Sequence, residues 1–193
     1  MPGPIIHKIA MKEAVKLINL TSNLNLNLKV GSYAENMEPD LVSSHGFDFE
    51  TNQGSIFECV KQCYYDLESV HDISRSLRYM CHYIVDAHTI GQIVGKYHGK
   101  IDRRIDFFSA FVPHKNKYQP KIKNYTDSFE HVNHLLMWSA YSVYFQHNER
   151  AKDARFLFSR DLKHMIRNAI QKGAEFTYEY FNLARQKGWL NRL

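Results

Sequence analysis

Residues 74–102 read SRSLRYMCHYIVDAHTIGQIVGKYHGKID, and the interpretation of the whole chain starts from this stretch. Its first half has the apolar spacing of an amphipathic helix, whose inward residues are Leu77, Met80, Cys81, Ile84 and Val85. It also contains two His/Asp pairs at one spacing, His82 with Asp86 and His98 with Asp102. Residues four apart share one face of a helix, so each pair can present an imidazole and a carboxylate to one ion.

Helical spacing recurs along most of the chain. Apolar periodicity predicts helices over residues 6–20, 55–69, 72–90, 96–108, 127–146 and 149–187. Asp127 is a candidate N-cap, Gly173 a candidate pause and Gly188 a stop. Residues 23–28 alternate Asn and Leu, which indicates either a short strand or an irregular segment. Five prolines and nine glycines are few for a many-turned β protein, so the sequence predicts one all-α domain over residues 1–193.

Composition and charge leave the partner open. Hydrophobic residues make up 44% and charged residues 23%, which is ordinary for a globular protein. The net charge of +5 suits an anionic partner such as a phosphate ester, nucleic acid or lipid headgroup, and it equally suits a solvated basic surface. Arg75 and Arg78 are expected to be solvated charges, with a phosphate contact as the alternative.

Cysteine usage and the chain start bear on the compartment. Cys59, Cys63 and Cys81 are odd in number and have apolar neighbours, which indicates buried thiols in a reducing compartment rather than a disulfide framework. The apolar start is interrupted at His7, so no signal peptide is expected. No apolar run approaches the roughly 18 residues of a transmembrane helix. We therefore expect a cytoplasmic protein.

The whole chain has 11 histidines, and the candidate metal ligands gather in its first part. In chain order they are His7, Asp40, His45, His82, Asp86, His98 and Asp102. Imidazole and carboxylate groups bind zinc, and they also bind iron and manganese. Most have a structural alternative: a helix start for His7, a turn for Asp40, and an ordinary surface pair or a satisfied buried histidine for each His/Asp pair.

Taken together and in this order, the motifs resemble the zinc-dependent phospholipase C family, which includes single-strand-specific nucleases. His82-Tyr83-Ile84-Val85-Asp86 is similar to the family's His-x-x-x-Asp helix. Pro39-Asp40 and His45-Gly46-Phe47-Asp48 resemble the carboxylate and the histidine loop that precede it, and His98-Gly99-Lys100-Ile101-Asp102 resembles the later pair. If Met1 is removed, His7 becomes the sixth residue, as in the nuclease branch.

This resemblance implies a phospholipase C/nuclease-like fold with a metal cluster in a cleft. It assigns a first zinc ion to Asp40, His45, His82 and Asp86. It assigns a second ion to His7, the terminal amine of Pro2 and Asp86, so that Asp86 bridges the two, and a third to His98 and Asp102. The implied reaction is hydrolysis of a phosphate ester by a metal-activated hydroxide held at Asp86. The implied substrates include phosphodiesters, nucleotides, nucleic acid and phospholipids.

Two positions depart from the family pattern, Gln92 and the chain start, where Pro2 would offer a secondary amine in place of the family's N-terminal tryptophan. Gln92 stands where the family has a further histidine for the third zinc ion, and glutamine is a poor zinc ligand. His88 does not replace it, because at two residues from Asp86 it points elsewhere on a regular helix. The sequence therefore leaves two functions open. One is a metal-dependent hydrolase of phosphate esters with two or three metal ions, and the other is a non-catalytic metal-binding or interaction domain that retains a degenerate site.

Overall fold

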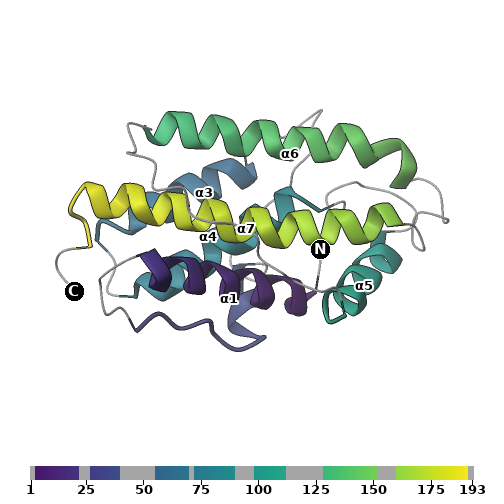
Figure 1. The fold of residues 1–193 in the computed structure, drawn as a ribbon, viewed down its shortest axis with the longest axis horizontal. Coiled ribbons are helices and arrows are strands. Elements are labelled where there is room, and N and C mark those ends of the chain that lie inside the picture. The colour runs from purple at the N-terminus through teal and green to yellow at the C-terminus, as the bar shows by residue number, and fades with distance from the viewer. Residues whose placement is uncertain are drawn as a thin grey trace.

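The chain folds into helices in the computed structural model shown in Figure 1. The structure describes residues 3–21, 27–39, 55–69, 72–89, 98–111, 128–151 and 160–190. Within them, the elements are α1 (Pro4–Thr21), a 3₁₀ turn η1 (Glu35–Met37), α3 (Ser55–Asp66), α4 (Ile73–Ala87), α5 (His98–Ser109), α6 (Phe129–Ala151) and α7 (Arg160–Gln186). The prediction of an all-α fold is confirmed for this part of the chain, whereas a single domain over residues 1–193 stays a prediction.

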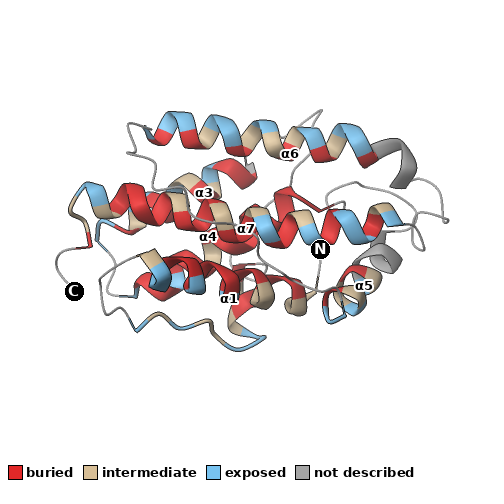
Figure 2. Cartoon of the chain, viewed as in Figure 1, coloured by how far each residue is buried: buried red, intermediate tan, exposed pale blue. Residues whose placement is uncertain are grey.

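Helix α7 is the central element, with α1 and α4 packed on it and on each other (Figure 1). Helix α3 covers α4, α5 contacts α1 and α7, and α6 lies along α7. The faces that α1, α4 and α7 turn toward one another are the most continuously buried part of the molecule (Figure 2). Their apolar side chains form one core cluster. The candidate ligands His7, His82 and Asp86 therefore belong to the helices at the centre of the fold.

Gly173 lies where α7 packs closely against both α4 and α1. A Cβ atom at this position would lie 2.6 Å from Val85 Cγ2 on α4 and 3.2 Å from Ala10 Cβ on α1. Helix α7 runs through the glycine without interruption. The predicted pause at Gly173 is therefore wrong, and the glycine serves helix packing rather than a break in the helix.

Helix ends follow local capping chemistry. Asp72 precedes α4, and its Oδ1 accepts a hydrogen bond from the Arg75 amide at 3.1 Å. Gly188 ends α7 with a φ of +75°, and the Trp189 amide donates to the Ala184 carbonyl at 3.1 Å, as in a Schellman motif. The predicted stop at Gly188 is thus confirmed. Before α6, the Ser128 hydroxyl accepts from the His131 amide at 3.3 Å, while the candidate cap Asp127 lies outside the described residues.

Some boundaries differ from the sequence expectation. Helix α4 ends at Ala87, before the Gly91 that marks the end of the predicted segment, and α6 extends to Ala151 rather than ending near Gln146. Of the alternating Asn/Leu segment, Asn27 and Leu28 are described and lie in no strand, while residues 23–26 lie outside the described residues. Within the described part, no helix combines the length and apolarity that crossing a membrane requires.

We predict that Gly173→Val lowers the free energy of unfolding by about 2 kcal/mol or more, because overpacking a dense core forces neighbouring atoms apart. Chemical denaturation monitored by circular dichroism measures this. Gln171→Val, at an exposed position two residues earlier, is the control and should change stability by less than about 1 kcal/mol. Equal stability of Gly173→Val and the parent chain would show that the three helices do not approach as closely as described.

We predict that a water-soluble disulfide reagent modifies Cys59 well before the other two cysteines in the native protein. Cys63 and Cys81 are buried, and burial raises the pKa of both thiols, that of Cys81 to about 12. At about pH 8 both therefore carry almost no reactive thiolate. The measurement is the number of thiols modified before and after denaturation, and rapid native modification of Cys81 would contradict the packing of α4.

Candidate metal centre

Three side chains from two helices meet in the core. His7 lies in the first turn of α1, and His82 and Asp86 lie one turn apart on α4. His7 is 1% exposed, and His82 and Asp86 are 0% exposed. The His7 Nε2 atom lies 3.4 Å from Asp86 Oδ1, and the His82 Nε2 atom lies 3.3 Å from Asp86 Oδ2. Each carboxylate oxygen therefore faces a different imidazole.

These distances are longer than usual direct hydrogen bonds and are compatible with ligands of a metal ion. A hydrogen bond between a charged nitrogen donor and a carboxylate is usually about 2.7–2.9 Å long. Two ligand atoms on one tetrahedral ion, with bonds of about 2.0–2.1 Å, lie about 3.3–3.4 Å apart by geometry. Both N···O separations in the triad have this length. One ligand atom from each of the three residues lies within 4.8 Å of the others, so all three can reach one ion.

A backbone carbonyl orients the His82 ring. Its Nδ1 atom lies 2.8 Å from the Asn36 carbonyl oxygen, in a buried contact. A carbonyl oxygen only accepts hydrogen bonds, so His82 Nδ1 must carry the hydrogen and donate it. In the neutral ring the lone pair is then on Nε2, the atom that faces Asp86. Metal-binding histidines commonly donate their second ring N–H in this way.

Helix α5 fixes the start of α1 and thereby the position of His7. Asp106 Oδ1 on α5 accepts a hydrogen bond from the Ile5 amide at 2.8 Å. Burial raises the pKa of the Asp106 carboxyl, and the α1 amide donors oppose this effect. A Cβ atom on Gly3 would lie 2.5 Å from the Asp106 Cγ atom, so only glycine fits this contact. The ring of His7 stacks on that of His82, with centroids 3.9 Å apart and planes 15° apart.

The neighbouring His88 belongs to a different network. Its Nδ1 donates to the Ile84 carbonyl at 2.7 Å, and its Nε2 lies 3.0 Å from the Ser139 hydroxyl on α6. Burial lowers the pKa of His88 to about 4, so the ring is neutral and accepts from Ser139. The expectation that His88 points away from the metal ligands is confirmed.

The structure brings three of the predicted ligands together and leaves the others undecided. His7, His82 and Asp86 form the buried triad. His98 and Asp102 belong to α5, and their side chains lie outside the part of the structure that is described. The remaining predicted ligands, which also lie outside it, are the Pro2 amine, Asp40, His45 and Gln92.

Two residues near the site have a role that sequence reasoning missed. Arg78 is buried, so its expected state as a solvated charge is wrong, and its Nη2 lies 3.7 Å from Glu35 Oε1. Its spacing, four residues before His82 on the stripe that continues to Asp86, was a usable signal. The Asn36 contact gave no such signal, because it is made by a backbone oxygen that every residue type carries.

Comparisons with known proteins assign no family. No family model, curated protein or solved structure matches the chain. The resemblance to the phospholipase C family therefore depends only on the motifs and their order.

We predict that the purified chain binds zinc and that the Asp86→Asn substitution weakens zinc affinity by more than about 100-fold. Loss of a group that only supports a ligand typically weakens metal affinity by about 10- to 100-fold, so a larger loss indicates a direct ligand. Asn keeps the shape of the side chain but removes the charge that both imidazoles face. Isothermal titration of metal-stripped protein provides the measurement. Asp66→Asn, at the end of α3, is the control and should bind as tightly as the parent chain. Equal affinity of the Asp86→Asn variant would exclude the triad as the zinc site.

Proposed function

We propose that this protein is a metal-dependent hydrolase of phosphate esters, with one of its metal ions held by His7, His82 and Asp86. The observation that carries the proposal is the buried triad, whose N···O separations of 3.3 and 3.4 Å match the spacing of ligands around a zinc ion. Two neutral imidazoles and one carboxylate form a ligand set typical of catalytic zinc sites. Iron and manganese are compatible with the same donors.

The residues of the triad divide the work of holding such an ion. Asp86 supplies negative charge where burial would make an unpaired cation costly. His82 presents Nε2 because its Nδ1 donates to Asn36, and His7 supplies nitrogen from a second helix. A divalent ion bound in such a site lowers the pKa of a coordinated water to near 7, which makes a nucleophile available at neutral pH.

The finer assignments follow from the resemblance and remain part of the proposal. The proposal includes the phospholipase C/nuclease-like fold and Asp86 as a bridging ligand. It also includes roles at further ions for Asp40, His45, His98 and Asp102. The orientation of Asp86, with each oxygen facing a different histidine, accommodates two arrangements: one ion held by all three residues, or two ions bridged by Asp86. The substrate class is a phosphodiester or phosphomonoester, including nucleotides, nucleic acid and phospholipids.

One observation favours a second candidate, a metal ion with a purely structural role. All three ligands are at most 1% exposed. Structural zinc sites are closed by protein ligands, whereas catalytic sites keep an open position for water and substrate. In this alternative the ion joins α1 to α4 and the protein is a non-catalytic metal-binding domain.

An assay of the zinc-loaded protein for hydrolysis of a chromogenic phosphodiester and a chromogenic phosphomonoester separates the two candidates. The hydrolase hypothesis predicts turnover that requires metal. The Asp86→Asn variant should lose this turnover, and the Asp66→Asn variant should retain it. Stoichiometric metal with no turnover on a broad panel of phosphate esters would support the structural ion. Less than one equivalent of any divalent metal in the purified protein would contradict both.

A further inference from the structure

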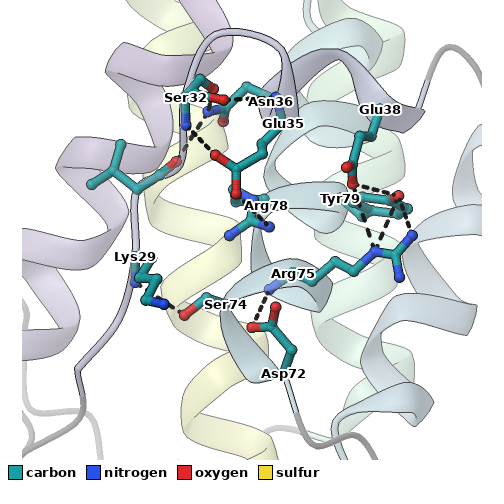
Figure 3. Close-up of polar contacts among 11 residues, drawn as sticks. Lys29, Ser32, Glu35, Asn36, Glu38, Asp72, Ser74, Arg75, Arg78 and Tyr79 are labelled. Carbon is teal, nitrogen blue, oxygen red and sulfur yellow. Dashed lines mark hydrogen bonds and ion pairs between the residues drawn. The ribbon is translucent and has the colours of Figure 1, made fainter.

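We propose that residues 29–38, here called the 29–38 segment, form a positioning element that sets the tautomer and orientation of His82. Asn36 and Arg78 are the positioning residues through which it acts. The link to metal affinity rests on the proposed metal site, whereas the orientation of His82 is a property of the protein without metal. Figure 3 shows the segment lying along α4.

The key contact is between the Asn36 carbonyl and His82 Nδ1, at 2.8 Å. Asn36 is 1% exposed, and its own side chain holds its backbone in place. The Asn36 Nδ2 atom donates to the Val30 carbonyl at 3.0 Å and to the Ser32 carbonyl at 2.8 Å. The Asn36 amide also donates to the Ser32 carbonyl, at 3.2 Å. Three hydrogen bonds thus hold Asn36, the residue whose carbonyl oxygen accepts the His82 hydrogen.

Arg78 attaches this turn to the helix that carries His82. The Arg78 guanidinium pairs with the Glu35 carboxylate. Glu35 Oε2 accepts a hydrogen bond from the Ser32 amide at 2.6 Å, and the Ser32 hydroxyl accepts one from the Glu35 amide at 3.2 Å. This reciprocal pair has the hydrogen-bond pattern of a capping box and lies in the turn that leads into η1. The Arg78 stem packs closely against Gly31, where a Cβ atom would be 2.7 Å from Arg78 Cδ. Gly31 also has a φ of +83°, which favours glycine for a second reason.

The attachment follows one stripe of α4. Ser74, Arg78 and His82 are spaced four residues apart, so they lie on one face of the helix. Ser74 Oγ accepts the Lys29 amide at 3.0 Å, Arg78 pairs with Glu35, and His82 donates to Asn36. The segment is thus bound at successive turns of the helix, and the last attachment is the metal-ligand candidate itself. A ring held in this way needs no reorientation to bind an ion.

The outer edge of the same segment supplies a matched control. Arg75 Nε lies 3.6 Å from Glu38 Oε2, with the arginine side chain 55% exposed, and the Tyr79 hydroxyl donates to the same Glu38 oxygen at 3.0 Å. Exposed ion pairs contribute little to stability. Arg75 and Arg78 therefore lie on the same helix and pair with the same segment, but only Arg78 is buried beside Asn36.

Nitrogen-15 NMR of histidine-labelled, metal-free protein tests the inference. At about pH 8.5, above the ordinary histidine pKa, we expect His82 to be protonated on Nδ1 alone. Comparison with His82→Gln assigns the signal. Asn36→Ala and Arg78→Met should produce a mixture of the two tautomers and weaken zinc binding by about 10-fold or more. Arg75→Met should retain the single tautomer and bind zinc within about 3-fold of the parent chain.

The outcomes are distinguishable. A parent protein with His82 protonated on Nε2 would overturn the inference, and this measurement requires no variant to fold. Asn36→Ala and Arg78→Met variants that lose thermal stability but keep the tautomer and the zinc affinity would also overturn it, since the segment would then be only structural. A parent protein that has the Nδ1–H tautomer but binds no metal would contradict the proposed function and not the orientation of His82.

Discussion

The arrangement of the central helices depends on the burial of the Asp86 carboxylate. An ionised carboxylate in a protein core costs several kcal/mol unless a partner compensates it. Asp86 is 0% exposed, and the groups that face its two oxygens come from α4 and from α1. Helix α1 must therefore approach α4 closely, in a defined register. The Asp106 contact at the start of α1 and the tight crossing at Gly173 both serve that register.

An ion in this position would connect folding to chemistry. It would join the first turn of α1 to the last turns of α4, two segments far apart in the chain. Binding of an ion to the folded state alone stabilises that state in proportion to the logarithm of its concentration over its dissociation constant. The same ion would thus stabilise the helix pair and supply Lewis acidity. Such a double role would explain why a polar triad occupies a position otherwise suited to leucine or valine.

Much of the central helix pair could be predicted from the sequence, because periodic patterns record local geometry. The 3.6-residue period predicted α1 and α4, and the four-residue spacing of His82 and Asp86 predicted that they share a face. His7 was a candidate ligand by residue type, and the structure places it beside them. Contacts between distant segments left no periodic trace. The contact with His82 is made by the backbone carbonyl of Asn36, which every residue type carries. Gly173 was interpreted as a helix interruption because a sequence does not distinguish a glycine that allows close helix packing from one that breaks a helix.

X-ray absorption spectroscopy of the zinc-loaded protein at the zinc edge tests most directly whether the ion binds at His7, His82 and Asp86. The account predicts a first shell of nitrogen and oxygen at about 2.0–2.1 Å with the outer-shell scattering of two imidazoles from His7 and His82. Sulfur at about 2.3 Å would instead place the ion at the Cys59 and Cys63 thiols. A first shell with sulfur, or one without imidazole scattering, would contradict the assignment of the metal centre to the buried triad.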